Sequence, residues 1–400
     1  MPTPLDRSPR LRPSPAFVQQ FTMDGRPFVA QDTEPYIQYW LSERYRLLLA
    51  LFGTRQGLRA EDAVAAWHRL HGSTPGGPED LRLRRAIDDL HGAGVLVGRD
   101  EDTSRYDRRI AADYVAHRPF PAEIARHLVQ AAGIGPATRV LDLAGGPGDL
   151  ALQLAAHSRA VTLLELSRGF TRFAAARARA QGLALRTEHE SANRLPQRDE
   201  PWDVVTVSQA LHWLDDVQVC RGVCRGLADD GSFFVVHSAI ELPDGHPLGY
   251  LLGHDSVLGA KPRQPFADEV QPLLQRLALL LQALHVGPVQ RVDLRESGQG
   301  GRAPIGVAGV ALFRQRRPFG PGFARGFLTP RHIELTGQAP AAFWQDLQAR
   351  CAGLPDTAFE GCHRWAVLHF RRGAPVQALP ALASAPEQAI GLQPWAAAAG

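Results

Sequence analysis

Three glycines follow an apolar run almost at once in the stretch VLDLAGGPGDLALQLA, residues 140–155. Glycine has no Cβ, so a turn of this composition lets a ligand approach the backbone closely. The spacing Gly146-x-Gly148-x-x-Ala151 fits the loose dinucleotide fingerprint, and Glu165 lies about where a ribose-binding acid is expected. The stretch therefore predicts a strand, a cofactor-binding loop and a helix.

Two residues of this stretch favour S-adenosylmethionine (SAM) over a dinucleotide. Pro147 has no N–H, so one donor is missing where a helix start would hold a pyrophosphate. SAM carries no phosphate, so the missing amide donor weakens its binding less than it would weaken the binding of a dinucleotide. Asp142 lies inside the strand, where dinucleotide-binding strands are usually apolar and SAM-binding strands often carry an acid. Both residues favour SAM, and a dinucleotide stays open as the alternative at this point.

Four segments add a resemblance to a known family. They occur in the order YVAHRPFP (114–121), VLDLAGGPG (140–148), LLEL (163–166) and SQALHW (208–213). Together they resemble the class I SAM-dependent methyltransferases, particularly the type 11 small-molecule group that includes trans-aconitate methyltransferase-like proteins. The resemblance implies an α/β fold with a Rossmann-like, doubly wound, mostly parallel seven-stranded sheet. It covers residues from about 110 to 240 well and the C-terminal third hardly at all.

The same resemblance assigns roles in the cofactor pocket. Glu165 would accept hydrogen bonds from the ribose hydroxyls, and Arg118 would pair with the cofactor's carboxylate. Ala144 replaces the family's first glycine. Ser191 stands where a family acid meets the adenine amino group, and a hydroxyl accepts that bond more weakly. The predicted cofactor-binding residues are Tyr114, Arg118, Asp142, Ala144, Gly145, Gly146, Gly148, Glu165, Leu166, Ser191, Ala192, Ser208 and Trp213.

Alternatives to these roles stay open. Glu165 could be a surface acid, and Arg118 a structural corner before a proline. Asp142 could orient the loop through backbone N–H groups without touching SAM.

His212 is the predicted catalytic residue, because it follows the fourth strand beside the expected position of the transferred methyl group. In the plant-type O-methyltransferases the corresponding histidine is a general base, whereas in the type 11 group the His-Trp pair is not clearly catalytic. His212 and Trp213 could instead only pack the cofactor and shape the pocket. A carboxylate acceptor would need no base, since positioning and exclusion of water supply most of the acceleration.

The elements around the loop predict the domain organisation. Helical spacing at 36–53, 59–71 and 78–94, followed by a hairpin pattern, predicts a winged-helix-like domain similar to that of plant-type O-methyltransferases. Alternating helices and apolar strands from about residue 121 predict a mostly parallel sheet. The predicted domains are a flexible leader (1–32), the winged-helix-like domain (33–112), the SAM-binding core (113–245), a C-terminal cap with remaining core strands (246–372) and a disordered tail (373–400).

Composition limits the partners. A net charge of +3 is too small to indicate nucleic acid, and Glu79, Asp80, Asp88 and Asp89 interrupt the third helix, which a DNA-recognition role would keep basic. No apolar run reaches about 18 residues, so no membrane partner is predicted. The winged-helix-like domain could instead mediate a homodimer or cover the substrate pocket.

The cysteines and one basic segment give further signals. Four widely spread cysteines indicate reduced thiols and a cytoplasmic location. Cys220 and Cys224 have helical i,i+4 spacing but no matching ligand pair nearby, so no metal site is predicted. The basic, aromatic segment 313–328 could hold an acidic substrate, line the pocket or be a solvated loop.

These observations predict a SAM-dependent methyltransferase acting on a small molecule, with oxygen (hydroxyl or carboxylate) as the acceptor atom, in secondary metabolism. Nitrogen or sulfur acceptors stay open. A non-catalytic regulator that senses SAM through the winged helix is the alternative of another class.

Overall fold

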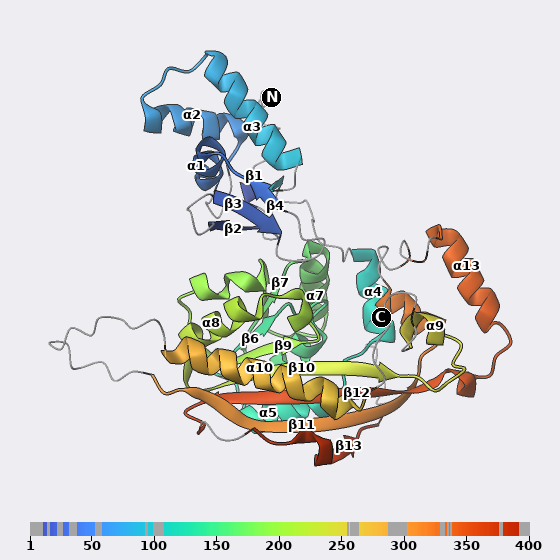
Figure 1. Cartoon of the computed structure of the whole chain (residues 1–400). Coiled ribbons are helices and arrows are strands. Elements are labelled where there is room, and N and C mark those ends of the chain that lie inside the picture. Colours follow the sequence, from blue (N-terminus) through green and yellow to red (C-terminus); the bar gives the residue numbers. More distant parts are fainter. Residues whose placement is uncertain are drawn as a thin grey trace. The chain divides into compact units, whose positions relative to one another are not determined.

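The computed structural model describes residues 11–13, 17–21, 27–31, 38–52, 58–92, 95–98, 108–253, 256, 264–286, 302–328, 333, 336, 338–375 and 379–391. Within those ranges, no helix combines the length and apolar character needed to cross a bilayer. The chain folds into two compact units (Figure 1). The first comprises Met1–Ser104 with the short pieces Leu166–Arg168 and His189–Ser191, and the second contains the remaining residues.

An eight-stranded sheet forms the centre of the second unit, in the order β13-β11-β12-β10-β9-β6-β7-β8. β12 runs antiparallel to both β10 and β11, whereas the pairs β6–β7, β6–β9, β9–β10 and β11–β13 are parallel. The strands are β6 (Arg139–Leu143), β7 (Ala160–Glu165), β8 (Leu185–His189), β9 (Trp202–Ser208), β10 (Leu227–Glu241), β11 (Ile305–Pro318), β12 (Glu360–Arg372) and β13 (Glu387–Ala389). The predicted mostly parallel α/β sheet is confirmed, but it has eight strands instead of the predicted seven, because β13 adds to the edge strand β11.

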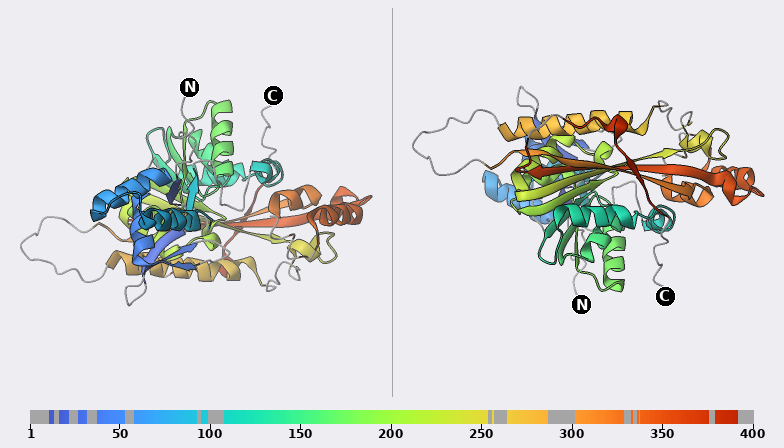
Figure 2. Two further views of the ribbon diagram at one scale, coloured as in Figure 1. Left: turned by 90° about the horizontal axis from the view of Figure 1, so that it is seen from above. Right: turned by 90° about the horizontal axis from the view of Figure 1, so that it is seen from below.

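Helices cover both faces of this sheet, and Figure 2 shows α5 and α10 on opposite sides of it. One apolar cluster includes buried residues of α8 and α10, and a second includes buried residues of α5 and α6. Both strand faces are thus buried, which explains why the strands are almost continuously apolar in sequence. The helices are α5 (Ala122–Ala132), α6 (Asp149–Ala155), α7 (Arg168–Ala180), α8 (Asp216–Gly226) and α10 (Phe266–Val286).

The C-terminal part contributes both sheet strands and a separate apolar cluster. β11 and β12 complete the sheet, while α9 (Gly249–Leu252), α11 (Pro321–Phe327) and α13 (Pro340–Cys351) enclose the cluster. α11 packs closely on α4 (Arg108–His117), because a Cβ on Gly326 would lie 2.7 Å from the carbonyl oxygen of Asp113. The close approach therefore requires a glycine.

The predicted disordered tail is wrong for residues 387–389. They form β13, which pairs with the edge strand β11, and the Ile390 amide donates to the carbonyl of Arg314 at 2.9 Å. An ion pair between Arg364 and Glu387 at 3.6 Å adds to this contact. β11 would otherwise leave unpaired backbone groups, so a distant segment is ordered by pairing with it.

The first unit contains the helices α1 (Glu43–Leu51), α2 (Ala60–His71) and α3 (Pro78–Gly92). The helix predicted at 36–53 begins later, because Ser42 caps α1 by accepting the Tyr45 amide, and Gln38–Trp40 form β4 instead. The three helices are otherwise close to their predicted ranges.

The predicted leader and the predicted hairpin both differ from the structure. The leader contains β1 (Leu11–Pro13), β2 (Phe17–Phe21) and β3 (Pro27–Gln31). β5 (Leu96–Gly98) pairs with β1, and β2, β3 and β4 form their own antiparallel sheet. Residues 99–107 lie outside the described residues, and the chain is already helical in α4 from Arg108. The winged-helix assignment is therefore not confirmed, because the strand that pairs with β5 comes from the far N-terminus.

Candidate functional site

The glycine loop joins β6 to α6 and has an unusual backbone. Ala144, Gly146 and Gly148 all have positive φ, at 49°, 58° and 87°. A Cβ on Gly145 would lie 2.2 Å from Leu163 Cδ1 and 2.3 Å from a carboxyl oxygen of Asp142, so only glycine fits against these strands. Ala144 departs from the family pattern, and its left-handed conformation costs an alanine about 1–2 kcal/mol.

The amides of the loop are already engaged inside the protein. The Gly146 amide donates to Glu165 Oε2 at 2.9 Å, and the Gly148 amide donates to the Gly145 carbonyl at 3.1 Å. Pro147 between them has no amide hydrogen. A pyrophosphate would therefore find no free donor at these three positions.

The start of α6 also disfavours a phosphate. Asp149, the first residue of α6, pairs with Arg177 at 2.5 Å, and Arg177 also donates to the Pro147 carbonyl at 3.1 Å. A carboxyl group thus already occupies the end of the helix that would attract an anion. The loop and the helix start together suit a cofactor without phosphate.

Two acids lie beneath and beside the loop. Glu165 ends β7 and is 7% exposed, whereas Asp142 on β6 is fully buried. The Thr206 hydroxyl donates to Asp142 Oδ1 at 2.6 Å. Burial raises the pKa of Asp142 to about 7, opposed by the Thr206 hydrogen bond and increased by the charge of Glu165. This burial favours the role in which Asp142 supports the loop rather than touching a ligand.

An aromatic pair lies next to the loop. The ring of Tyr114, on α4, meets the ring of Phe170 edge-on at 5.9 Å. A Cβ on Gly146 would lie 3.7 Å from Phe170, so this ring is in contact distance of the loop. Arg118 follows α4, stacks over Tyr114 at 4.5 Å and donates to Gln209 Oε1 at 3.2 Å. These contacts connect the glycine loop, α4 and the end of β9.

The remaining predicted residues are placed as follows. Leu166 follows β7 and Ser191 follows β8, and both belong to the first compact unit. Ala192 opens the short 3₁₀ helix η2 (Ala192–Gln197), and Ser208 ends β9. Their contacts with a cofactor stay predictions.

His212 and Trp213 lie in the 3₁₀ helix η3 (Leu211–Trp213), directly after β9. The His212 side chain is exposed, and its ring centroid is 4.9 Å from that of Trp213. Both proposed roles of His212 therefore stay predictions.

Gln209, His363 and Arg317 are not among the site residues predicted from the sequence. Gln209 has a φ of 52°, which is rare for a residue other than glycine and often marks a functional position. Ser238 donates to Gln209 Oε1 at 2.9 Å, and His363 Nε2 lies 3.1 Å from Ser238 Oγ. Nothing in the local sequence signals this network, since β10 and β12 meet through pairing over a long stretch of chain.

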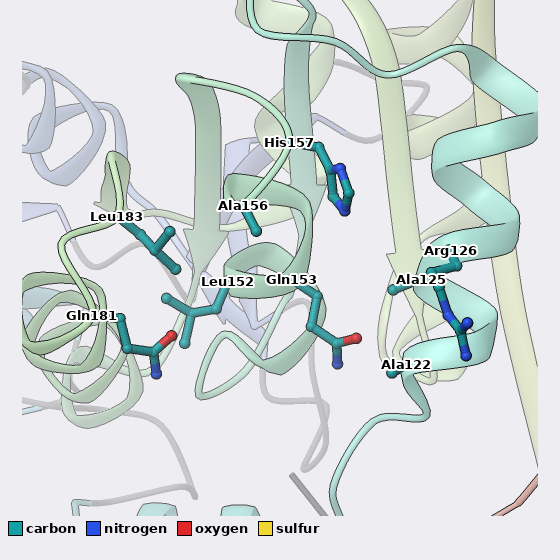
Figure 3. Close-up of a pocket in the computed structure, with 9 residues that line it drawn as sticks. All are labelled: Ala122, Ala125, Arg126, Leu152, Gln153, Ala156, His157, Gln181 and Leu183. Atoms are coloured by element: carbon teal, nitrogen blue, oxygen red, sulfur yellow. The ribbon is translucent and has the colours of Figure 1, made fainter. Parts of the chain in front are cut away.

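The pocket in Figure 3 lies away from this site, against helices α5 and α6 and the end of α7. It has a volume of about 330 Å³ and contains none of the predicted site residues. Its lining consists of Ala122, Ala125, Arg126, Leu152, Gln153, Ala156, His157, Gln181 and Leu183.

Cys220 and Cys224 lie on α8, and burial raises the pKa of both thiols, to about 11 for Cys224. Among the described residues, no group of three or more histidine, cysteine or acidic side chains gathers as a metal site.

Comparison with known proteins agrees with the loop and the sheet. Residues 140–231 match the family model of a methyltransferase domain. The uncharacterized protein Rv1405c of Mycobacterium tuberculosis is 36% identical over 102 residues, which are 24% of this chain and 37% of that protein. The uncharacterized methyltransferase YcgJ of Bacillus subtilis is 32% identical over 108 residues, which are 26% of this chain and 43% of that protein. The chain thus spans less than half the length of these relatives.

A solved SAM-dependent methyltransferase from Thiobacillus denitrificans, in complex with S-adenosyl-L-homocysteine, has a TM-score of 0.40. It is 18% identical, and the match covers 68% of this chain and 100% of that one. The family match covers residues 140–231, which include the glycine loop, and supports a methyltransferase enzyme. The type 11 subgroup stays a prediction.

Proposed function

We propose that this protein transfers a methyl group from SAM to a small-molecule acceptor, and that the accepting atom is oxygen. The observation that carries the proposal is the glycine loop, whose Gly146 and Gly148 amides are taken by Glu165 and by the Gly145 carbonyl. Such a loop suits a nucleoside without phosphate, and it lies within the segment that matches a methyltransferase domain.

Residues near the carboxyl ends of the parallel strands would each contribute differently to binding SAM. Glu165 would hold the ribose hydroxyls, because its carboxylate lies at the end of β7 and is oriented by the Gly146 amide. The Tyr114 and Phe170 rings provide apolar surface beside the loop that would exclude water.

The bound cofactor supplies an activated methyl group on a sulfonium. The protein then has mainly to align the acceptor and keep water away, since both reactants are held in one geometry. A hydroxyl acceptor would also need a base, for which His212 is the candidate, whereas a carboxylate acceptor would not. We place the reaction in secondary metabolism and the acceptor among small organic molecules.

Two measurements test this function. Isothermal titration calorimetry of the full chain should detect S-adenosylhomocysteine and no NAD, and the thermal midpoint should rise only with the former. Incubation with labelled SAM and fractionated extract of the source cells should then yield a small molecule heavier by one methyl group. NAD binding without S-adenosylhomocysteine binding would refute the cofactor. Cofactor binding with no methylated product would instead favour a regulator.

A further inference from the structure

Two arginines face the same aromatic ring near the carboxyl edge of the sheet. Arg118 follows α4, and Arg317 lies near the end of β11. The guanidinium carbons are 6.0 Å (Arg118) and 5.3 Å (Arg317) from the ring centroid of Phe323. Phe327 and Phe319 add further ring contacts, at 5.0 Å from Arg118 and 5.7 Å from Arg317. Two like charges therefore share one aromatic environment.

Within the described part of the chain, neither guanidinium has a carboxylate partner. Arg118 donates to the neutral Gln209 amide at 3.2 Å, and Arg317 donates to the His117 carbonyl at 2.8 Å. The Nε atoms of both arginines are buried and make no hydrogen bond with the described residues. Arg317 is only 9% exposed, and burial, with the charge of Arg118, lowers its pKa to about 10.

Other buried arginines of this unit are compensated. Arg198 pairs with Glu188 at 2.7 Å and Glu200 at 2.8 Å, and Arg372 donates to three backbone carbonyls. Arg317 differs from both, because it is buried with a single hydrogen bond to the described residues, and burying a charge without a partner costs stability. Local departures of this kind are expected at functional sites.

The polar groups that hydrogen-bond next to Arg118 add no negative charge, and Asp149, the acid on which the charge of Arg118 acts, is already paired with Arg177. Gln209, Ser238 and His363 form one hydrogen-bonded chain, and His363 is 3% exposed. Burial and the two guanidiniums keep the pKa of His363 well below its usual range, so the ring is neutral at neutral pH. His363 Nδ1 makes no hydrogen bond with the described residues. Because the Ser238 hydroxyl donates to Gln209, the neutral His363 ring donates through Nε2, and its Nδ1 is an acceptor. The two guanidiniums are therefore the groups of this cluster that offer donors and positive charge to a ligand.

Strand pairing brings this cluster to the same edge as the cofactor loop. β11 and β10 are both antiparallel to β12, so Arg317 and Ser238 lie at the carboxyl ends of their strands. Gln209 directly follows β9, which pairs with β6 ahead of the glycine loop. Arg118 and Gln209 are partly exposed, so a ligand can reach the pair from this side.

We propose that Arg317, beside Arg118, binds a carboxylate of the methyl acceptor, so that the substrate is a small organic acid, while Arg118 keeps its predicted role toward the carboxylate of the cofactor. This inference rests on the proposed function and names its substrate class. A planar guanidinium fork matches a carboxylate in two parallel hydrogen bonds, and the surrounding phenylalanine rings suit the apolar part of such an acid.

The test uses calorimetry on the full chain saturated with S-adenosylhomocysteine. The probes are acetate, succinate and benzoate, each compared with its neutral amide, and inorganic phosphate. The variants are Arg317→Gln, Arg317→Lys and the control Arg316→Gln, which removes the same charge from the exposed neighbour on β11. We expect at least one acid to bind better than its amide, and Arg317→Gln to weaken that binding about tenfold or more.

The controls separate this proposal from the proposed function. Arg316→Gln should stay within about twofold of the wild type, Arg317→Lys should recover part of the affinity, and cofactor affinity should be unchanged in all three. No preference for any acid, equal losses in the two glutamine variants, or a preference for phosphate would overturn the carboxylate site. Failure of the wild type to bind S-adenosylhomocysteine would refute the proposed function instead.

A stability measurement separates a binding role from a structural one. Arg317→Met removes a buried charge that lacks a partner, so its thermal midpoint should equal or exceed that of the wild type while acid binding is lost. A midpoint lowered by more than about 4 °C with acid binding intact would show that Arg317 is structural.

Discussion

At the scale of single residues, Glu165 carries the most specific expectation. Its Oε2 accepts the Gly146 amide, and glutamine can keep this bond through its carbonyl oxygen while losing the charge. Glu165→Gln should therefore weaken S-adenosylhomocysteine binding by about 1.5–3 kcal/mol, the scale of hydrogen bonds to a charged group, with the loop intact. Calorimetry gives the affinity, and the exposed Glu360→Gln is the matched control. Equal affinity in the two variants would place the ribose acid elsewhere.

The role of His212 determines whether the protein supplies a general base to the reaction. The side chain is exposed beside Trp213, and an organic acid methylated on its carboxylate is already ionised at neutral pH. We therefore expect His212→Gln to lower kcat by less than about tenfold and the pH profile to lack a histidine limb. Stopped assays with labelled SAM measure both. A kcat loss of about 10²–10⁴ with unchanged cofactor affinity would make His212 the general base.

At the scale of elements, the contact between β6 and β9 is expected to depend on pH. Asp142 lies opposite Thr206 in this pair and binds its proton more tightly when folded, because burial raises its pKa from 3.8 to about 7. The corresponding stability is fully present below about pH 4 and is lost as the pH rises to about 7.

Asp142→Asn tests this dependence, because asparagine keeps an acceptor for Thr206 and cannot ionise. The thermal midpoint of the variant relative to the wild type should rise by several degrees between about pH 5 and pH 8. Parallel curves across that range would show that Asp142 has an ordinary pKa. Asp203→Asn, on the neighbouring strand and paired with Arg139, should show no such rise, since Arg139 lowers the pKa of Asp203.

For the whole molecule, the open question is whether the first compact unit, which contains α2 and α3, joins two copies of the chain. Leu70 on α2 and Leu81 on α3 are 69% and 72% exposed, so both offer apolar surface to a second copy of the chain. We propose that this unit forms a homodimer, so light scattering of the full chain should give about twice the mass of 43.6 kDa. Leu81→Glu should shift the mass toward the monomer, whereas Arg82→Glu beside it should not. A monomeric wild type at high micromolar concentration would contradict the proposal.

The sequence by itself determined the loop and the order of the elements around it. Glycine spacing, Pro147 and the acids Asp142 and Glu165 act locally, because each affects a backbone within a few residues. The helices α2 and α3 were likewise predictable from apolar periodicity and end signals. The methyltransferase prediction, which came from the resemblance of four ordered segments to a known family, agrees with the matched domain.

Contacts between segments that are distant in sequence could be seen only in the tertiary structure. Leu11–Pro13 form a strand because they pair with β5, and Glu387–Ala389 form a strand because they pair with the edge of β11. Neither segment has a strong strand pattern in its sequence. Arg317 and Arg118 are distant in sequence and meet at Phe323 only through the sheet order and the packing of α11 on α4. A charge pattern shows that an arginine is present, but burial and the lack of a carboxylate partner are properties of the assembled fold.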